Sequence, residues 1–125
     1  MPGNCSAVSR RFKRKQKRAF ARFVHTLNPK MFAKMIRTIN IVKFGGTLVR
    51  EPYTKHLDDG IFEVRSQVGN NLSRVLYFFF DGRKIVLTHG FTKKTQKTPS
   101  GEIARAKKYR DRYKEQIVNK KTNMQ

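Results

Sequence analysis

Basic side chains in or just after three β-prone segments are the residues of this chain best suited to chemistry on a phosphate. Arg65 lies on the polar face of the first segment, Arg74 interrupts the second, and Lys93 and Lys94 follow the third. Planar guanidinium groups suit bidentate contacts to phosphate oxygens. A lysine acts as an acid or a base only if burial or a cationic neighbour lowers its pKa. We predict that Arg65 and Arg74, brought together by a tight turn, stabilise charge on a phosphate, and that Lys93 or Lys94 is the acid or base.

Each of these assignments has a structural alternative. Arg65 could pair with an acidic neighbour on the sheet, and Arg74 could be purely structural. The lysines could belong to an ordinary solvated loop. His89 and His56 are candidate general bases because histidine titrates near neutral pH. Either histidine could instead be a hydrogen-bonded structural residue.

The net charge of the chain indicates a polyanionic or acidic partner. The 125 residues contain 29 Lys and Arg against 8 Asp and Glu, which gives +21, and the first acidic residue is Glu51. Soluble domains ordinarily carry a net charge of about 2 to 8, and the excess here would repel itself without a partner. Nucleic acid is the commonest polyanion. Contacts to RNA are predicted for a set of basic and amide side chains: Lys55, Gln67, Lys97, Arg10, Arg11, Lys13 and Arg14.

Other classes of chemistry find no support in the sequence. The three histidines are far apart and there is a single cysteine, so neither a metal site nor an intrachain disulfide is expected. No phosphate-binding glycine loop, dinucleotide fingerprint or nucleophile elbow occurs, and no cofactor is expected. The longest apolar run, residues 75–80, is far shorter than the roughly 20 residues that cross a bilayer. With no secretory signal either, the expected location is the cytoplasm, without a membrane partner.

The first half of the chain is predicted to be helical beyond a basic arm. Residues 1–18 include a run of seven cations in nine residues and are expected to be a flexible arm, either a solvated tail or an RNA-binding segment. Apolar residues at 20–27 then follow the spacing of an amphipathic helix. Asn28 and Pro29 suit the cap and first turn of a second helix, which ends at Gly45. Two tightly joined helices make a helical hairpin.

The second half changes from helical to alternating periodicity. Three segments are predicted to be strands: 61–68, 73–80 and 84–91. Turn sequences, among them Asp81-Gly82, link these strands into an antiparallel meander. A last helix with a thin apolar face begins at Thr98. The expected class is α+β, with a two-helix hairpin packed on the meander and a C-terminal helix, in one domain at 19–117 with a flexible tail at 118–125.

Three segments of the sequence form an almost continuous match to a known family pattern: REPYTKHLDDGIFEVR at 50–65, VGNNLSRVLYFF at 68–79 and HGFTKKTQKTPSGEIARAKKY at 89–109. From about Phe20 to Tyr113 the chain resembles the phage-derived, HigB-like branch of the RelE/ParE toxins. The resemblance implies a RelE-like fold, in which two helices pack on one face of a curved antiparallel sheet. It also implies the toxin half of a type II toxin–antitoxin pair, with a small helix-turn-helix antitoxin as partner. Many such toxins are metal-independent endoribonucleases that cleave messenger RNA on the ribosome by driving the ribose 2′-hydroxyl onto the adjacent phosphate.

The sequence departs from that family at its beginning. Members usually open with a β-strand, whereas this chain has its basic run there, so the strand is either absent or reduced to Ala7-Val8. An inactive copy is therefore one alternative. A ParE-like inhibitor of DNA gyrase without catalytic activity is a second alternative. A basic RNA-binding protein of ribosomal type, which does not cleave, is the third.

Overall fold

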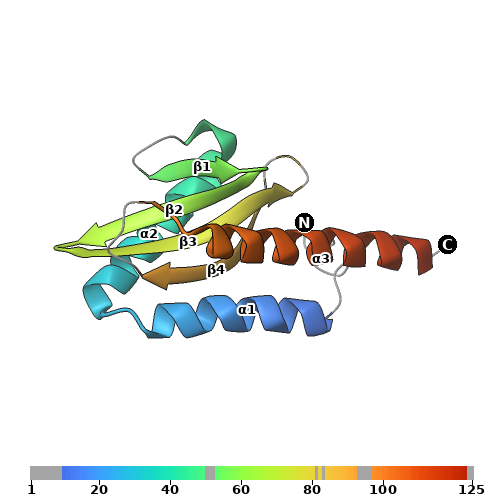
Figure 1. Cartoon of the computed structure of the whole chain (residues 1–125), viewed down its shortest axis with the longest axis horizontal. Helices are drawn as coiled ribbons and strands as arrows, with labels where there is room; N and C mark the ends of the chain where they lie inside the picture. The colour runs from blue at the N-terminus through green and yellow to red at the C-terminus, as the bar shows by residue number, and fades with distance from the viewer. Residues whose placement is uncertain (1–9, 50–52, 81, 83, 93–96, 124–125) are drawn as a thin grey trace.

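The computed structural model describes residues 10–49, 53–80, 82, 84–92 and 97–123. Its elements, in chain order, are α1 (Arg10–His25), α2 (Pro29–Gly45), the short 3-10 helix η2 (Gly46–Leu48), β1 (Thr54–Asp58), β2 (Ile61–Val68), β3 (Asn71–Phe80), β4 (Lys84–Thr92) and α3 (Ser100–Asn123) (Figure 1). The α+β class is confirmed. None of the helices in this described part is long and apolar enough to span a membrane.

The four strands form one antiparallel sheet in the order β1-β2-β3-β4. The expected meander is confirmed, and β1 is added to it. The sequence predicts only a connecting stretch there, because residues 54–58 are largely polar and, apart from Thr54, lie exposed or half-buried at the sheet edge. Pairing with β2, rather than an apolar pattern of its own, makes this segment a strand.

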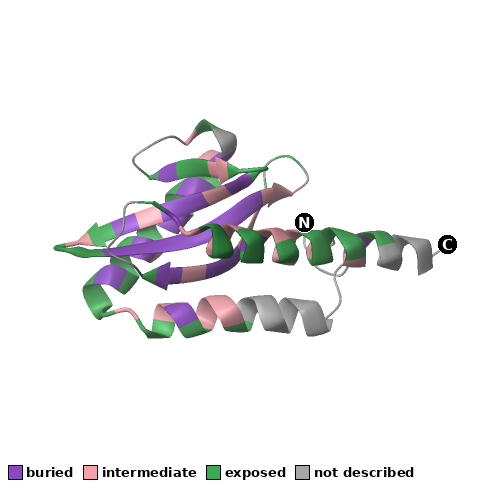
Figure 2. Cartoon of the chain, in the orientation of Figure 1, coloured by how far each residue is buried: buried purple, intermediate pink, exposed green. Residues whose placement is uncertain are grey.

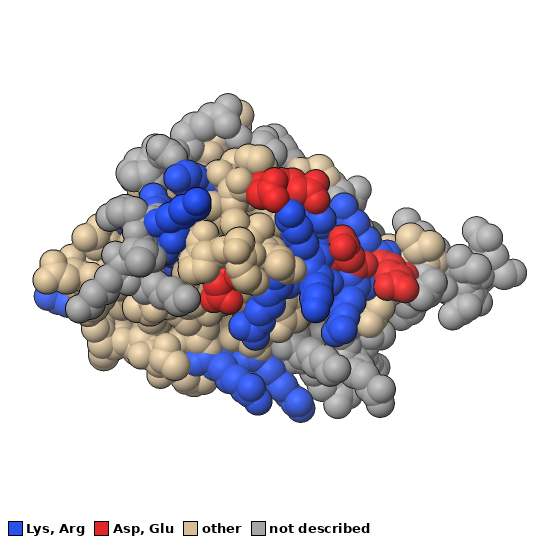
Figure 3. All heavy atoms as spheres, viewed as in Figure 1, with Lys and Arg blue, Asp and Glu red and all other residues tan. Residues whose placement is uncertain are grey.

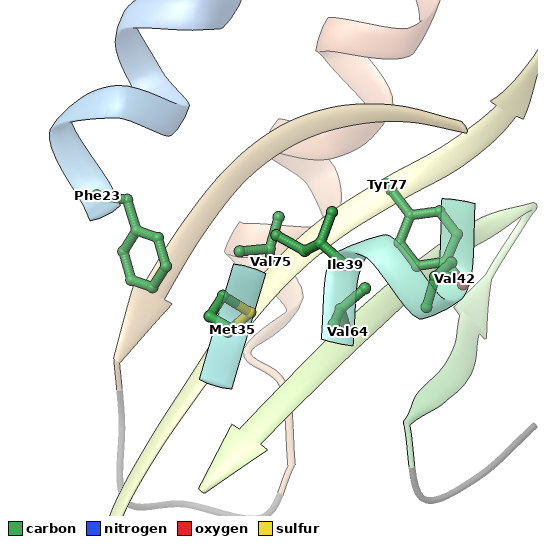
Figure 4. Close-up of a cluster of buried hydrophobic side chains, with 7 residues drawn as sticks. All are labelled: Phe23, Met35, Ile39, Val42, Val64, Val75 and Tyr77. Atoms are coloured by element: carbon green, nitrogen blue, oxygen red, sulfur yellow. The ribbon is translucent and has the colours of Figure 1, made fainter. Parts of the chain in front are cut away.

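The helical hairpin covers one face of the sheet. Asn28 caps α2 by accepting a hydrogen bond from the Met31 backbone N–H at 2.8 Å, with Pro29 in the first turn, as predicted. The side chains from α1, α2 and the sheet that meet in this core are Phe23, Met35, Ile39, Val42, Val64, Val75 and Tyr77 (Figure 4). Burial is concentrated along the central strands (Figure 2).

The last helix, α3, covers the opposite face of the sheet. A second core forms there from Ile61, Leu76, Phe78, Phe91 and Ala106. The thin apolar face predicted for α3 is confirmed, since Ala106 and Ile117 are buried while most of their neighbours are exposed. Because α3 lies on this face, it covers polar side chains of β2 and β3 that alternation alone would leave in water.

The predicted boundaries of the N-terminal arm and the C-terminal tail differ from the boundaries of the helices at the two ends of the described chain. The backbone is helical from Arg10, so the predicted arm at 1–18 ends within α1. Arg, Lys and Gln are good helix formers, which lets the basic run extend the amphipathic helix. At the other end α3 continues to Asn123, so the predicted tail at 118–125 begins inside a helix. The vestigial strand considered at Ala7-Val8 lies outside the described residues.

Candidate nucleic-acid interface

A buried carboxylate joins two of the predicted arginines to the segment that leads into α3. The side chain of Glu63 is only 1% exposed, and its Oε1 lies 2.9 Å from Nε of Arg65. Its Oε2 lies 3.5 Å from Nε of Arg74 and accepts a hydrogen bond from Oγ1 of Thr98 at 2.5 Å. We call these four residues the Glu63 cluster. Arg65 and Arg74 face each other in register on β2 and β3, as the predicted turn requires.

Arg74 is the buried member of this pair. Its side chain is completely inaccessible, and its guanidinium carbon lies 5.8 Å from the ring centroid of Phe91. Burial lowers the pKa of Arg74, and the Glu63 carboxylate opposes that change. The predicted direct contact between Arg74 and a phosphate does not fit this position, because the strand face that carries Arg74 is covered. The burial of Arg74 beside Glu63 favours the structural role that was the alternative for this residue.

Arg65 remains within reach of solvent, with its side chain 23% exposed. Residues 65–67 also line a hollow of about 340 Å³ on the α2 side of the sheet, together with Lys34 and Tyr53, whereas the Arg65 guanidinium lies with Glu63 and Arg74 on the α3 side. Lys34 donates a hydrogen bond from Nζ to the Gln67 backbone carbonyl at 2.5 Å. The structure thus brings Arg65 and Gln67, two predicted residues, to one place. It adds Lys34 and Tyr53, which the sequence did not indicate because they come from other elements.

The lysine-rich connection between β4 and α3 starts and ends beside the Glu63 cluster. At its start, the hydroxyls of Thr92 and Ser73 lie 2.9 Å apart, one residue from Arg74. At its end, exposed Lys97 precedes Thr98, which is bonded to Glu63. The predicted residues Lys93 and Lys94 lie outside the described residues. Lys55, also predicted, is exposed on β1 directly opposite Glu63.

The two histidines are placed apart from Arg65 and from each other. His56 is exposed on β1, where its Nε2 accepts a hydrogen bond from the Gly60 N–H at 3.3 Å. His89 is 1% exposed under α3, with Nδ1 3.2 Å from the Thr88 hydroxyl. Burial, reinforced by the nearby charge of Arg105, lowers the pKa of His89 to about 4. Within the described residues, no three His, Cys, Asp or Glu side chains gather as metal ligands would.

A basic groove lies between α1 and α3, over β4. This hollow of about 610 Å³ is walled by five exposed cations, namely Arg18, Arg22, Arg105, Lys108 and Arg112, and floored by residues that include Phe23, His89, Gly90 and Tyr109. In the space-filling view, Lys and Arg side chains gather along α3 and again along α1 beneath it (Figure 3). The described lining contains no Asp or Glu.

The sequence did not single out these five cations. Helical spacing offers a signal, since positions 18 and 22, and positions 105, 108 and 112, each share one helix face. The facing of the two helices, however, exists only in the folded chain. Of the predicted arm residues, Arg10, Arg11, Lys13 and Arg14 lie in the helical backbone of α1, and their side chains lie outside the described part.

Comparison with known proteins identifies the family. No curated protein matches the chain. The family described as "Phage derived protein Gp49-like (DUF891)" matches residues 22–111, well over half of the chain, including the whole sheet and the Glu63 cluster. The chain therefore belongs to the Gp49-like family of phage-derived proteins, which is part of the RelE/ParE-like toxin superfamily.

Proposed function

We propose that this protein is a HigB-like toxin of a type II toxin–antitoxin pair and that it cleaves messenger RNA on the ribosome. Membership of the Gp49-like family supports the toxin class. The α+β architecture is compatible with a RelE-like fold. The observation that favours RNA cleavage is Arg65. Its guanidinium is fixed by Glu63 at 2.9 Å, yet remains partly exposed beside the ends of the lysine-rich connection.

The chemistry proposed is attack of a ribose 2′-oxygen on the adjacent phosphorus. That bond forms while the bond from phosphorus to the 5′-oxygen breaks, leaving a 2′,3′-cyclic phosphate and a 5′-hydroxyl. The reaction needs a base for the 2′-hydroxyl proton, positive charge at the pentacoordinate phosphate and an acid for the leaving oxygen. We assign the charge stabilisation to Arg65, assisted by Lys97. Arg74 acts through Glu63, holding the carboxylate that orients Arg65.

We propose that Lys93 or Lys94 supplies the acid or the base. His89 is buried and neutral at physiological pH, and a pKa of about 4 makes it a weak base there. His56 pairs with Phe62, three residues along β2 from Arg65. Neither histidine is therefore well placed to act as a general base on a substrate bound by Arg65. Lys93 and Lys94 directly follow β4 in the chain, and either could act as acid or base if burial or a cationic neighbour lowers its pKa.

The partners follow from the same proposal. The substrate is messenger RNA on the ribosome, which places the protein in the cytoplasm. A cognate antitoxin, a small helix-turn-helix protein with an acidic segment, would neutralise part of the net charge of +21. This regulation requires charge complementarity and no cofactor.

A second candidate is an RNA-binding protein or decayed toxin that does not cleave. The complete burial of Arg74 and the near-complete burial of His89 favour it, because each removes a predicted catalytic group from reach of a substrate. Under this alternative the basic surface would bind RNA and leave it intact.

The test is induced expression of wild type, Arg65→Ala and Arg65→Lys, with mapping of transcript 5′ ends. Loss of one group that stabilises transition-state charge costs about 10²–10³ in rate, so new ends inside reading frames should disappear with alanine. They should be strongly reduced with lysine, which keeps the charge but not the bidentate geometry. Arg37→Ala, an exposed change on α2, is the control. Growth arrest without new ends would contradict the nuclease and redirect the search to gyrase. Binding without cleavage would support the second candidate.

A further inference from the structure

We propose that the basic groove between α1 and α3 binds the ribose-phosphate chain of single-stranded RNA. This inference deepens the proposed function, on which it rests for the identity of the nucleic acid. Neither Arg65 nor any other member of the Glu63 cluster lines the groove. It is therefore a second site, which holds RNA without acting on the scissile phosphate.

Ion pairing distinguishes the cations of α3 that face β1 from the cations of the same helix that line the groove. Lys107 lies 2.6 Å from the carboxylate of Asp58, and Arg110 lies 3.0 Å from that of Asp59. Arg110 also lies 3.2 Å from Asp111, and the Arg110 guanidinium lowers the pKa of Asp59. Ion pairs thus neutralise the cations of α3 that face β1 and its turn.

The groove cations show the opposite behaviour. Within the described residues none of Arg18, Arg22, Arg105, Lys108 and Arg112 forms an ion pair with Asp or Glu. Five exposed positive charges facing one another across a hollow repel each other unless an anion lies between them. Because they stand in two rows on facing helices, the complementary ligand is an extended polyanion rather than a single ion.

Close packing of α1 on β4 creates the groove. A Cβ atom on Gly90 would lie 2.3 Å from Cδ2 of Phe23, so only glycine lets the Phe23 ring rest on the strand. This contact fixes α1, and with it Arg18 and Arg22, beside α3. The same contact leaves Gly90 and His89 as the floor between the two cationic rows.

An aromatic surface in the groove favours RNA over an acidic peptide. The centroids of the Tyr109 and His89 rings lie 5.9 Å apart, and the guanidinium carbon of Arg105 lies 5.8 Å from the centroid of the Tyr109 ring. Tyrosine and arginine faces stack on the unpaired bases of single-stranded RNA, which strengthens binding whatever the base sequence. Carboxylates of a peptide would use the cations but would gain nothing from these flat faces.

The experiment compares two variants that remove the same charges from the full-length chain. Lys108→Gln/Arg112→Gln alters the groove, and Lys30→Gln/Arg37→Gln alters exposed positions of α2. Binding of a fluorescein-labelled oligouridylate is followed by anisotropy over a range of salt concentrations. Each phosphate contact contributes about 0.7 to the slope of log K against log salt. The groove variant should therefore lose about 1.4 from the slope, and the α2 variant should keep the wild-type slope.

Either of two slope results, or one competition result, would overturn this inference. The slope results are a groove variant that keeps the wild-type slope and an α2 variant that loses as much slope as the groove variant. The competition result is displacement of the RNA by polyglutamate as readily as by unlabelled RNA at equal anionic charge, which would identify an acidic peptide as the ligand. The outcomes are separable from the proposed cleavage. Loss of RNA binding in the groove variant, with no cleavage by wild type, would support the groove and reject the nuclease. Cleavage that depends on Arg65 while the groove variant binds RNA normally would do the reverse.

Discussion

A single carboxylate determines how the polar side chains of the central strands are arranged. Glu63 lies between Arg65 and Arg74 and also binds Thr98. Burying one cation of this set without a counter-charge would cost several kcal/mol, whereas the paired arrangement offsets that desolvation. Arg74 is thus tolerated in an apolar strand because Glu63 accompanies it.

Removing that counter-charge should destabilise the whole domain. Glu63→Gln keeps the shape of the side chain and can still accept the Thr98 hydrogen bond, but it removes the negative charge that pairs with buried Arg74. Breaking a buried ion pair on one side costs about 3–5 kcal/mol. The free energy of unfolding, measured by urea denaturation, should fall by that amount. Glu115→Gln, an exposed change on α3, should leave it unaltered, and equal stability of the two variants would refute the role of Glu63.

The burial of His89 predicts a pH dependence of stability. Its pKa is about 4 in the folded protein against 6.5 for the free side chain, so the unfolded chain binds the proton more tightly. Stability is then complete above about pH 6.5 and falls as pH decreases toward 4, by about 3 kcal/mol in all. Glu102, 3.7 Å from Nε2, and Arg105 are the charged groups that face the ring.

Denaturation at several pH values between 4 and 7.5 measures this dependence. His89→Gln removes the titrating group, so its curve should be flatter than the wild-type curve over that interval. His56→Gln serves as the matched control, because His56 is exposed and its loss should leave the slope unchanged. A wild-type slope retained in His89→Gln would show that other groups cause the acid sensitivity.

At the scale of elements, the spacing of apolar residues predicted those helices and strands that are stabilised by apolar packing. The hairpin of α1 and α2, its cap at Asn28 and the strands β2, β3 and β4 all follow from residues that recur on one face. The same method missed β1, which has few apolar residues and depends on pairing with β2. It also could not show that α3 covers the Arg74 side of the sheet, because so thin an apolar face does not specify where the helix packs.

The contact between α1 and β4 should be sensitive to one methyl group. Gly90→Ala places Cβ against the Phe23 ring, and overpacking of this kind costs about 1–3 kcal/mol because the helix must move. Unfolding free energies from denaturant curves would measure the loss. Phe23→Leu alone creates space, so the double variant Gly90→Ala/Phe23→Leu should be more stable than the sum of the two single effects predicts. Simple additivity would mean that the two residues do not interact as described.

At the scale of the whole molecule, the sequence predicts the amount of charge but not its distribution. A net charge of +21 is plain from composition. That Asp58 and Asp59 both pair with one side of α3 could not be predicted, since it requires the turn after β1 to lie beside the helix. Arg65 and Gln67 share one hollow, whereas the five groove cations became visible only through the packing of helices far apart in sequence.

The basic groove also has a consequence for the timing of synthesis. Of the described elements α1 comes first and α3 last, so the two walls are separated by the entire sheet. A growing chain that has released α1 and the strands possesses only one cationic row, because Arg105, Lys108 and Arg112 are still unmade or inside the exit tunnel. Thr98, the last member of the Glu63 cluster, also arrives late. The RNA-binding surface is therefore not assembled beside the ribosome that makes this protein until translation of the chain is almost complete.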